Sequence, residues 1–228
     1  VKEAKEKADM LILNILPRDI VEELKDHGYT KPKYYSSVSV LFTDFVGFTK
    51  IAELLSPQEL VGELDKCFSY FDSVTKRYKL EKLKTIGDAY MCAGGIPTEN
   101  GTHPIDCLLA AFEIQSFMKQ MKIIKSQLNL PYWELRLGIN TGPLIAGVVG
   151  ELKFAFDVWG DTVNTASRME SSGENGKINI SKDTFDRVKI LFECEHRGKI
   201  SAKNKGEMDM YFAISIKKDF SVNGGGHV

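Results

Sequence analysis

The chain has 228 residues, a hydrophobic fraction of 43%, and 30 basic against 31 acidic side chains, for a formal net charge of -1. This length suits one large domain, or a domain with a short appendage, that buries its core without disulfides or structural metal. The balanced charge argues against a nucleic-acid binder, which usually carries a basic excess. No apolar run approaches the roughly 18 residues of a membrane span, and no signal peptide is visible. The 4 cysteines form no C-x-x-C pair, which predicts reduced thiols rather than a zinc site.

Residues 1–28 are predicted to form a helical linker. Its apolar residues recur at alternating steps of three and four, the spacing of a heptad: Val1, Ala4, Ala8, Leu11 and Ile15. Pro17 interrupts this pattern, and a second short helix is expected over 18–27, ending at Gly28. Two heptads leave two alternatives open, the end of a coiled coil that reaches an upstream module and an amphipathic helix that packs on its own domain.

Strand and helix patterns alternate through the rest of the chain. Strands are predicted over 37–42, 80–86, 89–93, 135–139, 154–158, 177–180 and 210–216. Helices are predicted over 57–78, 103–128 and 162–169, and after a cap at Ser181. A polar linker is expected over 29–36, a glycine-rich stretch over 142–150, and a flexible tail over 218–228.

Two local signals in this pattern are specific. Ser56 and Glu59 flank Pro57 in the arrangement of a capping box, with proline at the first helical position. The strand patterns on either side of Gly87-Asp88 predict a β-hairpin. Helices that alternate with strands and hairpins predict an α/β or α+β sandwich, with helices packed on a mixed sheet.

Two carboxylates lie where a sheet can present chemistry to solvent. Asp44 is expected just past the first strand, and Asp88 at the tip of the hairpin. Magnesium takes one or two carboxylates together with phosphate oxygens, so this pair is a candidate metal site. The backbone N–H groups of Gly47, Phe48 and Thr49, near the start of a helix, could hold a phosphate. For either aspartate alone, a role as a turn or cap residue stays open.

Three long stretches in this order resemble the class III adenylyl/guanylyl cyclase catalytic domain. They are LFTDFVGFT at 41–49, LKTIGDAYM at 83–91 and FDVWGDTVNTASRM at 156–169. The resemblance implies a catalytic domain over 37–217. It also implies an α+β fold of the ferredoxin-like palm type, with a mixed, mostly antiparallel sheet covered by helices. The activity it implies is conversion of ATP to cyclic AMP and pyrophosphate.

The resemblance also implies a metal site. Asp44 and Asp88, helped by the Phe45 carbonyl, would ligate two Mg²⁺ ions, with Mn²⁺ able to substitute. One metal would activate the ribose 3′-hydroxyl and the other would hold the triphosphate, so that positioning and charge neutralisation do most of the catalysis.

Further roles follow from the same resemblance. Asn164 and Arg168 are four apart on a predicted helix and share a face. The family uses such a pair on the ribose and on the charge that develops at the α-phosphate. Lys203 resembles the family's phosphate-binding lysine. The family usually has glycine where this chain has Asn204, which leaves the conformation of that loop open.

Lys84 and Asp157 occupy the family's two base-reading positions. Adenine offers an acceptor at N1 and a donor amino group at N6, whereas guanine offers a donor at N1 and an acceptor at O6. A lysine donor with an aspartate acceptor complements adenine, and a mismatched guanine would leave polar groups unpaired. The pair therefore predicts ATP as the substrate.

The resemblance further implies a head-to-tail homodimer, because the family builds each active site from two domains and this chain carries both sets of residues. A cytoplasmic catalytic domain under an upstream sensor is expected, with no nucleic-acid partner and no membrane contact by this segment. Whether the intact protein is membrane-anchored is left open. The alternatives are a guanylate cyclase that uses GTP and a catalytically silent nucleotide-binding dimerisation module. A palm-type enzyme that makes dinucleotides is a third, but its acidic-glycine signature is absent.

Overall fold

The computed structural model describes residue 7 and residues 10–150 and 154–221. An eight-stranded sheet has the order β2-β3-β1-β4-β6-β8-β7, and β5 pairs with β4 off this path. The strands are β1 (Lys33–Val46), β2 (Glu81–Ile86), β3 (Ala89–Gly94), β4 (Glu134–Val149), β5 (Ala155–Trp159), β6 (Ile178–Ser181), β7 (Phe192–Ala202) and β8 (Gly206–Ile216). The helices are α2 (Arg18–His27), α3 (Phe48–Ala52), α4 (Pro57–Arg77), α5 (His103–Gln127), α6 (Asp161–Ser171), α7 (Lys182–Val188) and the 3-10 turn η1 (Lys218–Phe220).

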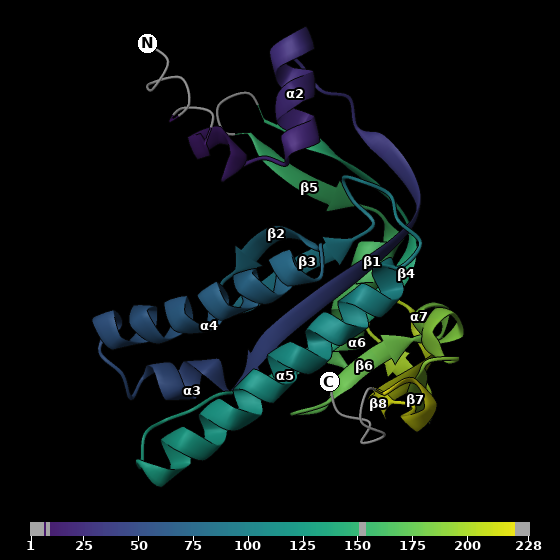
Figure 1. Cartoon of the computed structure of the whole chain (residues 1–228). Coiled ribbons are helices and arrows are strands. Elements are labelled where there is room, and N and C mark those ends of the chain that lie inside the picture. Colours follow the sequence, from purple (N-terminus) through teal and green to yellow (C-terminus); the bar gives the residue numbers. More distant parts are fainter. Residues whose placement is uncertain (1–6, 8–9, 151–153, 222–228) are drawn as a thin grey trace.

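The strand pairing confirms the predicted α+β class. Only β4 and β6 run parallel, and every other pair in the described sheet is antiparallel. Side chains alternate between the two faces of β1. Leu41 and Phe45 join the core beneath α4 and α5, which lie side by side in Figure 1. Val38, Val40 and Phe42 join a second core on the opposite face, which the segment around α2 and strand β5 cover.

The local signals for helix ends are confirmed. Ser56 Oγ accepts a hydrogen bond from the Glu59 backbone N–H at 3.3 Å, and the Glu59 carboxylate accepts one from the Ser56 N–H at 2.9 Å. Ser181 caps α7 by accepting from the N–H of Thr184 at 3.2 Å. These caps satisfy N–H groups that the first helical turn leaves unpaired. The sequence alone therefore locates the first residue of α4 and of α7.

The prediction of helices in the N-terminal segment is confirmed in part. Helix α2 begins after Pro17 and ends at Gly28, whose φ of 75° is the left-handed conformation that closes a helix. Ile20 and Val21 of α2 are buried against the sheet, so this helix packs on its own domain. Of the heptad positions before Pro17, the described Leu11 and Ile15 are 58% and 67% exposed. The first three heptad positions lie outside the described residues.

The sheet is more extensive than predicted. Strand β1 includes the second half of the expected linker and continues through Asp44, because β4 pairs with it from Lys33 to Val46. Asp44 therefore lies inside the strand and not past it. The glycine-rich stretch is the second half of β4. Strand β7 was not predicted, because it is an edge strand whose side chains are mostly charged or polar.

Helix α6 lies directly on β4, and the glycine pattern explains why. Gly138 and Gly142 alternate with Asn140 on one face of the strand. A Cβ atom at Gly138 would lie 1.9 Å from the backbone nitrogen of Glu170, and one at Gly142 would lie 2.6 Å from Thr162 Oγ1. The Asn140 side chain donates to the Thr162 carbonyl at 3.0 Å. This face of β4 thus fixes the position of the helix along its length.

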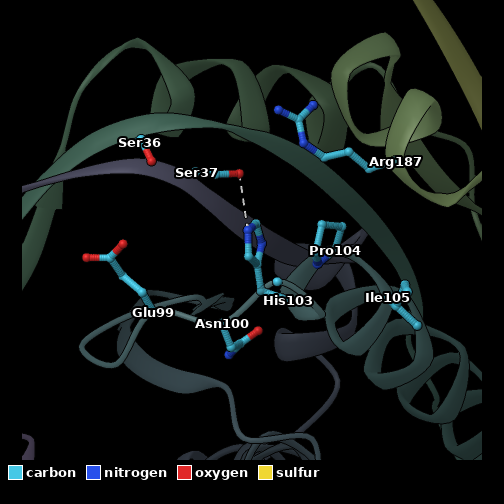
Figure 2. A pocket seen from close by; sticks show the side chains of 9 residues that line it. Ser36, Ser37, Glu99, Asn100, His103, Pro104, Ile105 and Arg187 are labelled. Atoms are coloured by element: carbon cyan, nitrogen blue, oxygen red, sulfur yellow. Dashed lines mark hydrogen bonds between the residues drawn. The ribbon is translucent and has the colours of Figure 1, made fainter.

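A buried histidine ties α5 to β1 at the end of the strand away from Asp44. The His103 ring is hydrogen-bonded to the hydroxyls of Ser37 and Ser39 at 3.2 and 2.8 Å, and Figure 2 shows the first of these bonds. Burial, and then the positive charge of Arg187, lower the pKa of His103 to about 4. The imidazole is therefore neutral at physiological pH and serves as a structural link. It borders an open pocket of about 550 Å³.

The contact between α6 and β4 can be tested with Gly138→Ala. The added methyl group cannot be accommodated without moving α6, and overpacking of this kind costs about 1–3 kcal/mol or more. Gly62→Ala in α4 is the control, because a Cβ there meets nothing within 4 Å, and replacing a helical glycine stabilises by about 0.5–1 kcal/mol. Urea unfolding of both variants gives the comparison. Equal stability of the Gly138 variant and the parent would contradict the packing described.

Candidate active site

The structure brings Asp44 and Asp88 together. Thr43 of β1 pairs with Tyr90 of β3 at the end of their ladder, and Asp44 and Asp88 follow one and two residues beyond this pair on the two strands. Gly87, with a φ of 63°, makes the turn that presents Asp88. Burial, and then the negative charge of Asp44, raise the pKa of Asp88. The two carboxylates are thus close enough to repel one another, as a pair that shares a cation would be.

Two side chains that sequence reasoning missed complete this cluster. Arg136 of β4 lies opposite Asp44 in the strand register, and its Nη2 donates to Asp44 Oδ2 at 2.9 Å. Its Nε donates to Glu170 Oε1 of α6 at 3.0 Å. Burial raises the pKa of Glu170 to about 7, although Arg136 acts in the opposite direction. The available signal was an arginine flanked by Leu135 and Leu137 in a mostly apolar strand. Nothing in the sequence marked Glu170.

This donor set fits a hard divalent cation. Carboxylate oxygens are what magnesium and manganese prefer, and magnesium typically uses only one or two of them and fills its other positions with phosphate oxygens and water. Among the described residues, no group of three or more histidine, cysteine, aspartate and glutamate side chains could hold a metal on its own. The carboxylate pair can therefore supply the protein ligands of such an ion, and water or phosphate oxygens would fill its remaining positions.

Aromatic packing fixes the backbone that follows Asp44. Phe45 is buried, with ring centroids 5.1 Å from Trp133 and 6.0 Å from Phe68. Phe48 stacks on the same tryptophan at 5.6 Å. Between them Gly47 adopts a φ of 69°, which turns the chain into the short helix α3. The Phe45 carbonyl and the N–H groups of 47–49 are thus part of a rigid turn beside the carboxylate pair.

Lys84 and Asp157 form an ion pair within one chain. Lys84 comes from β2 and Asp157 from β5, 73 positions later. Their side chains are 43% and 20% exposed, so both can still be reached from outside. The fold therefore brings these two candidate base-reading residues into direct contact.

Asn164 and Arg168 lie on the outer side of α6. The residues of α6 that are buried against the sheet share the opposite side of the helix and are Thr162, Thr165, Ala166, Met169 and Glu170. Asn164 is exposed and Arg168 is half-buried. Within one chain, therefore, this pair faces away from the side of α6 that touches the carboxylate cluster through Glu170.

The turn that contains Lys203 connects β7 and β8. Asn204 adopts a φ of 63°, the left-handed region that glycine favours and that asparagine tolerates best among other residues. The asparagine thus supports the conformation for which a glycine is usual. Lys205 pairs with Asp161 at the start of α6, which holds the turn beside that helix. Lys203 itself is exposed.

Comparison with known proteins gives the family. Residues 30–215 match the model of the adenylate and guanylate cyclase catalytic domain. Human guanylyl cyclase C is 39% identical over 220 residues, which is 95% of this chain and 20% of that protein. An adenylate cyclase of Mycobacterium bovis is 39% identical over 217 residues, 93% of this chain and 47% of that protein. The chain therefore spans less than half the length of either relative.

A solved structure is similar to this chain in both sequence and fold. The catalytic core of a rhodopsin-guanylyl cyclase with converted specificity, in complex with ATPαS, is 35% identical, with a TM-score of 0.74 over 81% of this chain and 98% of that one. The chain belongs to the adenylate and guanylate cyclase catalytic domain family, and it is a class III nucleotide cyclase domain. No helix in the described part of the chain has the length and apolar character needed to cross a membrane.

Proposed function

We propose that the chain is the catalytic domain of an adenylate cyclase, which converts ATP to 3′,5′-cyclic AMP and pyrophosphate. The observation that carries the choice of ATP is the ion pair of Lys84 and Asp157. The lysine can donate to adenine N1 while the aspartate accepts from the N6 amino group. Because the two charges also stay next to each other, neither loses its partner when the base binds. Guanine would place a donor against the lysine and an acceptor against the aspartate, which leaves both mismatched.

The triphosphate would bind at the other cluster. Asp44, Asp88 and the Phe45 carbonyl are the proposed ligands for two Mg²⁺ ions, with Mn²⁺ as a substitute. When bound, these ions supply Lewis-acid activation of the 3′-hydroxyl and neutralise charge on the phosphates. The N–H groups of Gly47, Phe48 and Thr49 would hold a phosphate against the rigid turn.

The remaining residues would act on the sugar and the reacting phosphate. Arg168, whose planar fork of donors suits phosphate oxygens, would stabilise charge at the α-phosphate, and Asn164 would orient the ribose. Lys203, on its exposed turn, would reach the terminal phosphates. All three are proposed from the family resemblance, and the exposure of Asn164 and Lys203 leaves these two side chains accessible to a ligand.

The proposed active unit is a head-to-tail homodimer. Asn164 and Arg168 face away from the side of α6 that meets the chain's own carboxylate cluster. One chain alone therefore does not direct both this pair and its own carboxylates at one substrate. A second copy that brings its Asn/Arg face and its Lys84–Asp157 pair to the carboxylates completes the site, and two-fold symmetry then generates two such sites.

The family resemblance also supports a proposed setting. Residues 37–217 would form the cytoplasmic catalytic unit, and residues 218–228 a tail. Residues 1–28 would connect the unit to an upstream sensor.

The choice of substrate is tested by product identity. The chain is incubated with equimolar ATP and GTP and Mg²⁺ or Mn²⁺, and the products are identified by mass. We expect cyclic AMP with pyrophosphate release, and none from Asp44→Asn. Cyclic GMP as the main product would identify a guanylate cyclase, and metal-dependent binding with no product from either nucleotide would identify a silent module.

Base recognition is tested by Lys84→Glu combined with Asp157→Cys. This exchange replaces the donor with an acceptor, so we expect kcat/KM for ATP to fall and that for GTP to rise, within the roughly 10⁴-fold range that a hydrogen-bonding site can discriminate. Lys82→Glu, which changes a neighbouring lysine paired with Asp72, should keep the parent's preference. A double variant that still prefers ATP as strongly as the parent would rule out this assignment.

The shared site is tested by mixing two inactive chains, Asp44→Ala and Arg168→Ala. Each heterodimer would contain one site with both residues intact, so we expect activity to return on mixing, up to about half that of a parent dimer. Each variant assayed alone provides the baseline. Proven heterodimers with no recovered activity would show that the sites are not shared.

A further inference from the structure

A continuous chain of charged side chains links α6 to the carboxylate pair. Glu170 accepts from Arg136 Nε at 3.0 Å, and Arg136 Nη2 donates to Asp44 at 2.9 Å. We infer, on the basis of the proposed function, that Glu170 is a positioning residue of the metal site. It fixes Arg136 in the orientation in which a terminal guanidinium nitrogen holds the Asp44 carboxylate beside Asp88.

The backbone around Glu170 is held firmly enough for this role. Its nitrogen lies against Gly138, where no side chain could be inserted. The carbonyl of the preceding residue, Met169, accepts from Asn179 at 2.7 Å. Glu170 is 8% exposed and Met169 is fully buried. The carboxylate therefore projects from a fixed point, as a group that orients another side chain must.

The guanidinium can relay that position because it is planar. Its donors form a rigid fork, so once Nε is bound to Glu170 the direction of Nη2 is set. Arg136 also supplies the positive charge that offsets repulsion between Asp44 and Asp88. A lysine carries the same charge but has a single ammonium group and no fixed plane, so it cannot define both contacts in the same way.

Loss of Glu170 has two separable consequences. Without an acceptor at Nε, Arg136 is free to rotate and Asp44 loses its fixed orientation. In addition, one negative charge leaves the cluster, which weakens attraction for a cation. Glu170→Ala removes both the acceptor and the charge, whereas Glu170→Gln removes the charge and keeps an oxygen that can accept from Nε.

The experiment measures Mn²⁺ binding to the nucleotide-free chain, by electron paramagnetic resonance of the unbound ion. We expect Glu170→Ala to weaken binding by about 10–100-fold, the usual effect of removing a group that supports a metal ligand. Glu170→Gln should weaken binding clearly less than Glu170→Ala, because it loses the charge but keeps an acceptor for Nε. Glu174→Ala is the matched control, since this carboxylate lies four residues on and pairs with Lys177 and Arg197 instead. It should bind as the parent does.

Three results would overturn the inference: unchanged binding in Glu170→Ala, an equal loss in Glu170→Gln, or an equal loss in Glu174→Ala. The second would mean that charge matters and position does not. If Glu170→Ala melts too low to assay, Arg136→Lys tests the same contact with the charge retained, and we expect a comparable loss. Parent-like binding in that variant would also count against the inference.

The outcome is independent of the cyclase reaction. A parent chain that binds Mn²⁺ but forms no cyclic nucleotide would refute the proposed function alone. A parent that cyclises ATP while Glu170→Ala binds Mn²⁺ normally would refute the positioning role alone.

Discussion

The close approach of α6 to β4 is the constraint on which the rest of the site depends. Gly138 leaves no space between strand and helix, and Asn140 ties the start of the helix to the strand. Because side chains alternate along a strand, the residues next to Gly138, Leu137 and Ile139, build the core on the opposite face. One strand therefore both anchors the helix that carries the polar groups and supports the helices α4 and α5 behind the sheet.

The second constraint is electrostatic. Burial, and then the negative charge of Asp44, raise the pKa of Asp88 and of Glu170, and both effects oppose folding. A single guanidinium, that of Arg136, lies between Asp44 and Glu170 and leaves the cluster with more acidic than basic groups. Such an imbalance costs stability in the free protein, and a bound divalent cation would remove it. In the proposed enzyme, the cluster would thus favour a positive ligand at a cost to the stability of the free domain.

Sequence reasoning succeeded where the deciding interaction is local. The capping box at Ser56 and the hairpin around Gly87 involve residues a few positions apart, and both are confirmed. The hairpin and the motif around Asp44 were enough to nominate the two aspartates. Sequence reasoning failed where contacts between residues far apart in the chain decide the structure. Gly142 was expected in a glycine-rich stretch after the strand, yet it lies within β4 and, like Gly138, allows close packing of α6. Arg136 and Glu170 meet only because that packing brings residues 34 positions apart together.

In the proposed dimer α6 belongs to two active sites at once. Its buried side supports the carboxylates of its own chain through Glu170, while its outer side offers Asn164 and Arg168 to the partner's substrate. An 11-residue helix pressed against a strand moves as one body. In that dimer, substrate that pulls on the outer side would shift the inner side as well. Occupancy of one pocket would then alter affinity in its twin, which makes cooperative binding an expected consequence of the shared helix.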